Sequence, residues 1–235
     1  MNNDAKLKTN PSGVLIIVGT PIGNSMDLSA RGIEALVKAD FVLAEDTRVT
    51  RKLSRIRNFK IKKLISFNDY NEDKKLSLVI KKIKEGSNVV LSSDAGMPLI
   101  SDPGYKLVNE CIKNDIVIDV VPGPSSIITA IVTSGLATNN FYFAGFPIKK
   151  KKARIDSLSK LAEMNTTIIW FESPKRILSF LNELVIVFGN RQAVVARELT
   201  KVYQEVLRDS LVSLISQLEK KTRLKGEYVI LIEGN

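Results

Sequence analysis

The stretch NVVLSSDAGMPLISDPG, residues 88–104, joins a short β-branched run directly to a segment that is dense in turn-forming residues. The run NVVLSS is nearly continuous in apolar character, which is typical of a strand buried on both faces of a parallel sheet. The thirteen residues from Ser92 to Gly104 then contain two aspartates, two glycines and two prolines. Because such residues dominate turns, the stretch predicts a buried strand whose carboxyl end opens into a tightly turned loop.

The rest of the first half repeats this strand pattern and alternates it with helical patterns. Further strands are expected at 13–19, 41–45 and 116–121. Amphipathic periodicity predicts helices over 28–38, 72–85 and 104–114. Strands that alternate with helices of this length indicate an α/β unit with a mostly parallel sheet, and the strand composition predicts that each strand is buried on both faces.

The second half has the composition of a mixed sheet. Strands are expected at 166–173, 192–198, 203–209 and 227–233, and helices at 151–163, 174–188 and 210–220. Only LTKV separates the second and third of these strands, which predicts an antiparallel hairpin. We therefore expect a ragged N-terminus over 1–12, an N-terminal α/β domain over 13–121 and a C-terminal α/β domain over 122–235, with the boundary near VPGPSS (121–126).

Composition excludes several functional classes. A chain of 235 residues that is 44% hydrophobic can bury a proper core, and its longest apolar runs are too short to span a membrane. The first residues lack the apolar region of a secretory signal, so a cytoplasmic location is expected. The chain contains one cysteine, Cys111, and no histidine. We therefore expect no disulfide, no metal site and no histidine-based catalysis.

The charge of the chain permits an acidic partner such as RNA. The formal net charge is +10, and no acidic residue interrupts the basic segment 48–63. Val49, Leu53 and Ile56 recur at helical spacing there, which predicts a surface helix with the basic residues on its outer face. A shorter basic segment covers 149–154. Either segment could equally be a solvated face without a partner.

Three turns follow predicted strands, and together they suggest a ligand site. Neither a dinucleotide-binding fingerprint nor a phosphate-binding P-loop occurs in the sequence. The turns are GTPIGN (19–24), SSDAGMP (92–98) and VPGPSS (121–126). In open α/β sheets, ligands bind outside the carboxyl ends of the strands, where these turns would meet. Gly96 would allow a close backbone approach, Asp94 could accept hydrogen bonds, and Ser125 is typical of a helix start; each could also be only a turn or a cap.

Seven motifs in the chain occur in a familiar order. They are GTPIGN (19–24), AEDTR (44–48), SDAGMPLISDPG (93–104), VPGPSS (121–126), FESPKR (171–176), ARELTK (196–201) and GEYVILIEG (226–234). From Gly13 to Gly234 the chain resembles the RsmI family of bacterial 16S ribosomal RNA cytidine-2'-O-methyltransferases, within the tetrapyrrole methylase superfamily. The resemblance implies two α/β domains, S-adenosylmethionine bound between them, and a homodimer. It also implies methylation of the ribose of a cytidine in the decoding centre of 16S rRNA.

The resemblance also carries expectations for single residues. The cofactor would contact Pro21, Asp94, Ala95, Gly96, Met97, Ser125, Ser126, Phe171, Gly226 and Glu227. The RNA substrate would contact Gly23, Asn24, Arg48, Tyr70, Lys175, Arg176 and Arg197. Phe171 could equally be a core residue at a strand end.

A ribose hydroxyl is a poor nucleophile until its proton is withdrawn, and without histidine the base must be a carboxylate, a lysine or water. Glu45 and Asp46 are the predicted catalytic residues, because they end a buried strand beside Arg48. Arg48 could hold either the substrate phosphate or the carboxylates. The alternative is structural, with Asp46 as a helix cap and Glu45 paired to Arg48.

The chain departs from the family pattern where members commonly carry histidine. The matching positions here are Val49, Asn68 or Tyr70, and Lys175. If those histidines serve as a base or an RNA contact elsewhere in the family, either Tyr70 and Lys175 substitute for them or this enzyme is slower. RNA contacts are expected from the two basic segments. The expected partners are 16S rRNA, within the small ribosomal subunit, and a second copy of the chain, whereas a membrane and DNA are not expected. Two alternatives remain, a tetrapyrrole C-methyltransferase and an RNA-binding protein without catalysis.

Overall fold

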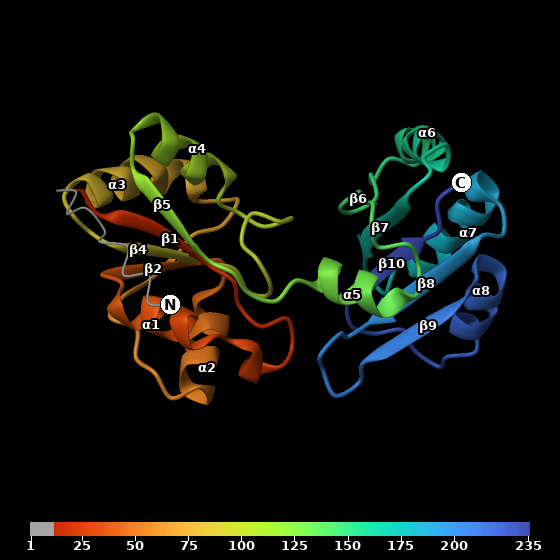
Figure 1. Ribbon diagram of the computed structural model, residues 1–235, viewed down its shortest axis with the longest axis horizontal. Coiled ribbons are helices and arrows are strands. Elements are labelled where there is room, and N and C mark those ends of the chain that lie inside the picture. The colour runs from red at the N-terminus through yellow and green to blue at the C-terminus, as the bar shows by residue number, and fades with distance from the viewer. Residues whose placement is uncertain (1–11) are drawn as a thin grey trace. The chain divides into compact units, whose positions relative to one another are not determined.

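The computed structural model describes residues 12–235, which divide into two compact units. The first ends at Pro124 and the second covers Ser125–Asn235; in Figure 1 the first unit runs from red to yellow-green and the second from green to blue. Apart from Ser12, the predicted ragged N-terminus lies outside the described residues. Within residues 12–235, no helix combines the length and the apolar character that crossing a membrane requires.

The first unit is built on a parallel sheet of five strands. They are β1 (Val14–Val18), β2 (Phe41–Ala44), β3 (Leu64–Ser66), β4 (Val89–Ser92) and β5 (Val117–Val121). Their order in the sheet is β3-β2-β4-β1-β5, and every neighbouring pair is parallel, as predicted. The sequence analysis missed β3, because three residues are too few to show a period.

Helices cover both faces of this sheet. They are α1 (Ala30–Lys38), α2 (Thr47–Ile56), α3 (Glu72–Lys84) and α4 (Tyr105–Lys113). Alternate strand residues form two separate cores, one with Ile83 of α3 and Leu107 of α4, the other with Leu36 of α1. Figure 1 shows α3 and α4 on one face, and α1 and α2 on the other. The strands are thus held between two helical layers, and their carboxyl ends lie at one edge.

Strand β5 corrects the prediction that all four long strands are buried on both faces. Val117 is 41% exposed and Val120 is 42% exposed, whereas Val121 is buried. The reason is position, because β5 is the last strand in the sheet and pairs only with β1. Its apolar composition is that of an inner strand, but the helical layers do not cover it completely.

Helix α2 corrects a second prediction, that the side with Val49, Leu53 and Ile56 packs against the protein. Val49 is 38% exposed and Ile56 is 56% exposed, and the buried residues of the helix are Thr50 and Ser54. The Ser54 hydroxyl donates to the Arg51 carbonyl oxygen at 2.9 Å, so its burial leaves no polar group unsatisfied. Small side chains and the partly buried Leu53 pack against the first unit, whereas Val49 and Ile56 remain at the surface. The predicted outer face with Arg51, Lys52 and Arg55 is exposed, as expected.

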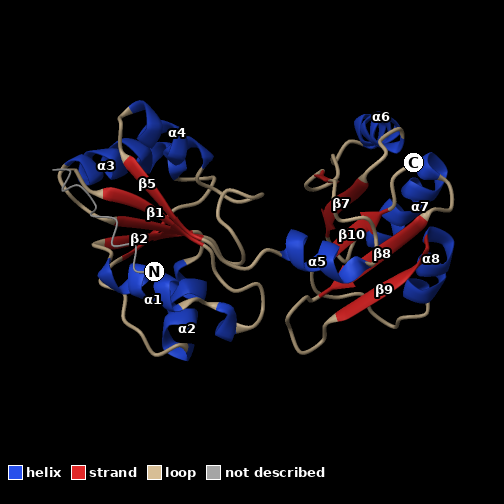
Figure 2. Cartoon of the chain, in the orientation of Figure 1, coloured by secondary structure: helices blue, strands red, loops and turns tan. Residues whose placement is uncertain are grey.

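The second unit contains a mixed sheet, as predicted. Its strands are β6 (Phe141–Phe143), β7 (Thr167–Glu172), β8 (Gln192–Arg197), β9 (Glu205–Ser210) and β10 (Tyr228–Ile232). Their order is β6-β7-β10-β8-β9; β6 and β7 are parallel and the other neighbours are antiparallel. The predicted hairpin is the β8–β9 pair, whose strands lie side by side in Figure 2. Strand β6 was not predicted.

Four helices pack on this second sheet: α5 (Ser126–Ser134), α6 (Lys151–Ala162), α7 (Ile177–Phe188) and α8 (Leu211–Glu219). One core joins Trp170 and Tyr228 of the sheet to the apolar sides of α7 and α8. Helix α5 lies against β8, β9 and β10. Strand residues that alternate with this core, such as Val194 and Val229, are also buried, so both faces of the sheet are covered.

Candidate active site

Three strand-end turns of the first unit interlock through their backbones. The Gly19 N–H donates to the Val121 carbonyl oxygen at 3.0 Å, and Thr20 exchanges two backbone hydrogen bonds with Gly96 at 2.8 and 3.1 Å. A Cβ atom on Gly19 would lie 2.7 Å from the backbone of Gly123, so glycine is required at this contact. The predicted convergence of the turns after β1, β4 and β5 is therefore confirmed.

The loop that follows β4 has an unusual backbone, with positive φ angles at four positions. Gly96, Leu99, Ser101 and Gly104 all have positive φ angles, of 84°, 72°, 63° and 124°. Leu99 and Ser101 occupy a region that non-glycine residues rarely adopt. A Cβ atom on Gly104 would lie 2.6 Å from the side chain of Leu91. Such strain persists only where the surroundings enforce it, and it is common at functional sites.

The turn after β2 is organised by Asp46. Its carboxylate caps α2 by accepting the Arg48 N–H at 2.8 Å, and it also accepts the Arg48 guanidinium, with Nη2 at 2.5 Å. Hydrogen bonding to Arg48 lowers the pKa of Asp46 to about 2. The capping alternative is thus confirmed, but Arg48 pairs with Asp46 and not with Glu45. The Asp46 carboxyl group is therefore ionised at neutral pH, and Arg48 donates hydrogen bonds to both of its oxygens.

Asp94 connects the ends of two neighbouring strands. Its Oδ1 accepts the backbone N–H of Asp46 at 3.0 Å, which joins the β4 turn to the β2 turn. Burial, as the largest cause, raises the pKa of Asp94 above its ordinary value. The side chain is therefore held at the carboxyl edge of the sheet, where the predicted cofactor contact would require it.

Several carboxylates share this edge of the sheet. Glu45, Asp69, Asp94 and Asp102, together called the acidic edge, interact electrostatically with one another. Burial and then the charge of Asp94 raise the pKa of Glu45. Burial and then the charge of Glu45 raise the pKa of Asp102 to about 7, although a hydrogen bond with Ser93 opposes the shift. Within residues 12–235, no group of acidic side chains is arranged to hold a metal ion.

Sequence reasoning missed Asp102 and treated it as a turn residue. One signal was available, because the pair Ser93–Asp94 recurs as Ser101–Asp102 within the same loop. Whether such a residue reaches the strand ends depends on how the loop folds back. The positive φ angle of Ser101, beside Asp102, belongs to that return.

The other predicted residues of the first unit differ in their exposure to solvent. Pro21 is buried, and Gly23 is exposed. The Asn24 side chain caps the short 3-10 helix Ser25–Asp27 by accepting the Met26 N–H at 3.0 Å. Tyr70 is 95% exposed. Their predicted contacts with cofactor or RNA stay predictions.

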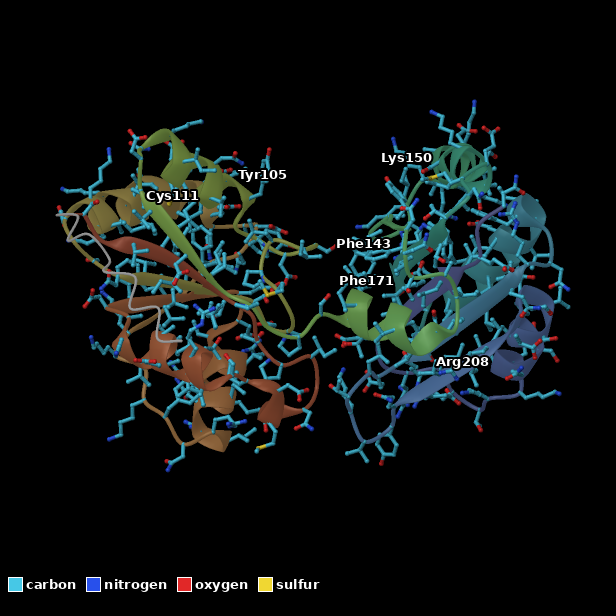
Figure 3. The ribbon with its side chains drawn as sticks, viewed as in Figure 1. Tyr105, Cys111, Phe143, Lys150, Phe171 and Arg208 are labelled. Carbon is cyan, nitrogen blue, oxygen red and sulfur yellow. The ribbon has the colours of Figure 1, made fainter. Side chains whose placement is uncertain are left out.

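Phe171 of β7 lies in an aromatic group of the second unit. Its ring centroid is 4.8 Å from that of Phe143 and 5.5 Å from that of Phe146, with edge-to-face geometry in both pairs. Figure 3 labels Phe143 and Phe171 at the strand ends. Phe146 is 55% exposed and Phe171 is half-buried, so this group presents an apolar surface to solvent and is not a closed core.

Arg176 has a structural partner. Its Nε donates to Glu172 at 2.9 Å, and the Glu172 side chain is only 1% exposed. A buried carboxylate without a cation would be costly, so this pair stabilises the start of α7. Lys175 is exposed and has no hydrogen bond or ion pair within the described residues. Of the two neighbouring cations, Lys175 is therefore the one that is available to a substrate.

Ser125 caps α5, in agreement with the predicted helix start. Its side chain accepts the Ile128 N–H at 3.5 Å, and Ser126 is the first residue of the helix. The hydroxyl of Ser125 is thus directed to its own helix, and both serines remain half-buried.

The turn before β10 is shaped by Glu198. Gly226 has a φ angle of 90°, and a Cβ atom there would lie 2.6 Å from the carboxyl group of Glu198. Glu198 accepts the Glu227 N–H at 3.0 Å, and Lys201 bridges Glu198 and Glu227 at 2.9 and 2.8 Å. Packing on Glu198 therefore explains why this position needs glycine. The ARELTK motif contains both Glu198 and Lys201, but the sequence analysis assigned neither of them.

Arg197 pairs with Tyr228 across β8 and β10. Its Nε and the Tyr228 hydroxyl are both buried without a hydrogen-bond partner, and one Nη donates to the Tyr203 carbonyl oxygen at 3.5 Å. The buried Nε is turned into the unit, so at most the outer part of this guanidinium can meet a substrate.

Comparison with known proteins places this fold in a class of methyltransferases. The family model for tetrapyrrole (corrin/porphyrin) methylases matches residues 14–215. A solved cobalt precorrin-4 methyltransferase, a cobalamin biosynthetic enzyme, superimposes with a TM-score of 0.69 over 94% of each chain at 18% identity. Uroporphyrin-III C-methyltransferase from Thermus thermophilus, complexed with S-adenosylhomocysteine, gives a TM-score of 0.64 over 93% of this chain and 97% of that one, also at 18% identity. These structures share the fold.

Curated relatives are more similar in sequence. Ribosomal RNA small subunit methyltransferase I of Thermotoga maritima is 45% identical over 94% of this chain and 99% of its own length. The protein of the same name from Haemophilus influenzae is 42% identical over 96% of this chain and 80% of its own length. The chain belongs to the ribosomal RNA small subunit methyltransferase I family, within the tetrapyrrole methylases.

Proposed function

We propose that this chain transfers a methyl group from S-adenosylmethionine to the ribose 2'-oxygen of a cytidine in the decoding centre of 16S rRNA. The observation that carries the proposal is the acidic edge, where a carboxyl group with a pKa of about 7 lies beside interlocked strand-end turns. Relatives up to 45% identical are named for methylation of the RNA of the small ribosomal subunit. The decoding-centre cytidine follows from the motif resemblance.

The residues of each unit suit the chemistry of S-adenosylmethionine. In the first unit, the strained loop exposes its backbone at Ala95 beside the half-buried Asp94 carboxylate, which can accept hydrogen bonds from hydroxyl or ammonium groups. In the second unit, the aromatic group around Phe171 offers an apolar surface to an adenine ring. When bound, the cofactor supplies a methyl group on a positively charged sulfur. The residues proposed to hold it are Pro21, Asp94, Ala95, Gly96, Met97, Ser125, Ser126, Phe171, Gly226 and Glu227.

Asp102 is the best-matched proton acceptor on the acidic edge. A general base works best when its pKa lies near the operating pH, and the pKa of Asp102 is about 7. Asp46, with a pKa of about 2, is too weak a base to hold a proton at neutral pH. We therefore assign Asp102 to take up the proton that the 2'-hydroxyl loses on methylation. Glu45 raises the pKa of that group, and Asp46 positions Arg48 and α2.

The setting of the reaction belongs to the same proposal. We place the activity in the cytoplasm, with 16S rRNA of the small ribosomal subunit as the substrate and a homodimer as the active form. The net charge of +10 favours a polyanionic substrate. Gly23, Asn24, Arg48, Tyr70, Lys175, Arg176 and Arg197 remain the proposed substrate contacts. Among them, Lys175 is the cation that the described structure leaves uncommitted.

Transfer of labelled methyl groups tests the proposal. Small ribosomal subunits that lack decoding-centre modification, and naked 16S rRNA, are incubated with the protein and labelled S-adenosylmethionine, and the labelled nucleoside is identified. Label in 2'-O-methylcytidine is expected. Asp102→Asn should keep cofactor binding, measured by calorimetry, but lose transfer, whereas Asp119→Asn on the exposed edge strand should retain it. Glu45→Gln should keep cofactor binding and shift the pH dependence of transfer to lower pH, because it removes a charge that raises the pKa of Asp102. Cofactor binding without label in either RNA would contradict the proposal and favour a tetrapyrrole substrate.

A further inference from the structure

The basic residues of segment 48–63 differ in whether the fold already uses their side chains. Arg57 donates to the Ser25 carbonyl oxygen at 2.7 Å, and Lys62 donates to the Lys38 carbonyl oxygen at 2.9 Å. These cations are committed to the fold. Three others on α2 are exposed, and their side chains have no hydrogen bond or ion pair within residues 12–235. They are Arg51, Lys52 and Arg55, hereafter the α2 cationic face.

The cationic face adjoins the acidic edge. Helix α2 begins directly after Asp46, and Asp46 follows Glu45 of the acidic edge. From residue 48 to residue 55 the helix advances about 10 Å, so cations on successive turns form a row that leads away from the candidate active site. No acidic residue lies between 47 and 63, so no carboxylate on α2 itself balances the charge of this row.

Apolar side chains accompany the cations. Val49 and Ile56 are 38% and 56% exposed on the same helix, and Met26 of the neighbouring 3-10 helix is 71% exposed. Arg57 donates to the Met26 sulfur at 3.5 Å, which holds this side chain beside α2. A surface that combines unpaired cations with exposed apolar side chains can neutralise phosphates and also cover sugar or base surface.

In the other basic segment, Arg154 is committed to the second unit, whereas the lysines at 149–152 are exposed. Arg154 of α6 donates to both carboxylate oxygens of Glu183 at 2.6 and 2.7 Å, and to the Ile148 carbonyl oxygen at 2.7 Å. The donors of Arg154 are thus already used within the second unit, and the expected RNA contact of segment 149–154 stays a prediction that would depend on its lysines. The α2 cationic face is the better candidate for contact near the reacting nucleotide, because α2 begins directly after Asp46 at the acidic edge.

We propose that the α2 cationic face binds the phosphate backbone of the RNA beside the nucleotide that is methylated. This inference rests on the proposed function and names the surface that holds its substrate. A repeating polyanion matches cations that recur on successive helical turns, which favours RNA over an acidic protein as the partner. Because each phosphate contact releases counterions, the face should supply a large share of the salt dependence of binding.

The test compares two triple variants that lose the same charge. The first is Arg51→Gln with Lys52→Gln and Arg55→Gln. The control is Lys74→Gln with Lys160→Gln and Lys220→Gln, three exposed lysines without a side-chain partner in the described structure. Binding of a 16S rRNA fragment that contains the decoding centre is followed by fluorescence anisotropy between 50 and 300 mM salt, about the range over which such contacts weaken. Thermal unfolding of both full-length variants verifies that they fold.

The expected result is a change of slope in the first variant only. Three single-strand phosphate contacts contribute about 2 to the slope of log affinity against log salt, so the magnitude of this slope should fall by about 2. Affinity at 100 mM salt should fall at least about tenfold, and the control should stay within about threefold of the parent. The apparent KM for RNA should rise with the loss of affinity.

Three outcomes would overturn the inference: an unchanged slope in the first variant, an equal loss in the control, or no RNA binding by the parent. Equally effective competition by poly-glutamate would indicate an acidic protein partner and would also overturn it. Methyl transfer by the parent is measured in parallel. RNA binding that depends on the α2 cationic face without any transfer would contradict the proposed function alone, whereas transfer with an unchanged slope would contradict the inference alone.

Discussion

Asp102 links catalysis at the acidic edge to the stability of the protein, and Asp102→Asn separates the two. Burial, and then the charge of Glu45, raise the pKa of Asp102 from 3.8 to about 7. Below pH 7 the carboxyl group is protonated and cannot accept the proton of the substrate hydroxyl. Turnover by the parent protein should therefore fall about tenfold for each pH unit below 7, and Asp102→Asn should be inactive throughout.

The same pKa has an opposite effect on stability. The folded protein binds this proton more tightly than the unfolded chain, so the stabilisation is complete below about pH 4 and is lost as the pH rises to about 7. A shift of about three pH units corresponds to about 4 kcal/mol. Because the side chain remains partly exposed, solvent screening reduces this value, and we expect about 2 kcal/mol. At pH 8, Asp102→Asn should exceed the parent in unfolding free energy by that amount.

Two measurements on the full chain test this prediction. Methyl-transfer rates are recorded from pH 5.5 to 8.5, and urea unfolding of parent and Asp102→Asn is followed by circular dichroism at pH 5 and pH 8. The stability difference should shrink at pH 5, where the parent carboxyl group is protonated. Asp119→Asn serves as the control, because its side chain is exposed on β5. A stability difference that does not change with pH, or normal turnover in Asp102→Asn, would refute the assignment.

Three further predictions concern the fold that supports the site. Gly104→Ala should destabilise the chain by about 2 kcal/mol in urea unfolding, because φ is 124° and Leu91 blocks the new methyl group, whereas Gly135→Ala, with open space around it, should cost about 1 kcal/mol. Arg176→Ala should cost about 3 kcal/mol in the same assay, because it leaves the Glu172 carboxylate buried and unpaired. Cys111 is buried and its pKa is raised to about 11, so it should react with a thiol reagent only after urea unfolds the chain; rapid labelling of the native protein would contradict this.

Local sequence patterns were sufficient to predict most of the elements. The runs that became β1, β2, β4 and β5 stand out because apolar β-branched residues end in turn-forming residues, and parallel strands bring those ends to one edge. The convergence of the strand-end turns was predictable for the same reason. The strands β3 and β6, of three residues each, were not, because they form through pairing with β2 and β7 and have too few residues to show a pattern.

Partners both near and distant in the sequence, together with burial, decided the chemistry of individual side chains. The sequence marked Glu45 and Asp46 as equivalent catalytic candidates, but pairing with Arg48 lowers the pKa of Asp46 while burial raises that of Glu45. Asp102 joined them only because its loop folds back to the strand ends. Similarly, Arg55 and Arg154 each lie in a basic segment of the sequence and could not be distinguished there. In the structure, Arg154 forms an ion pair with Glu183, and the Arg55 side chain has no partner within the described residues.

The sequence by itself therefore determined the fold class, the family motifs and the strand-end turns. Tertiary structure decided which carboxyl group can accept a proton and which cations remain for RNA. The physical reason is that helix and strand periods are set by neighbours along the chain. Burial, pKa and ion pairing depend instead on distances across the folded units, which only packing establishes.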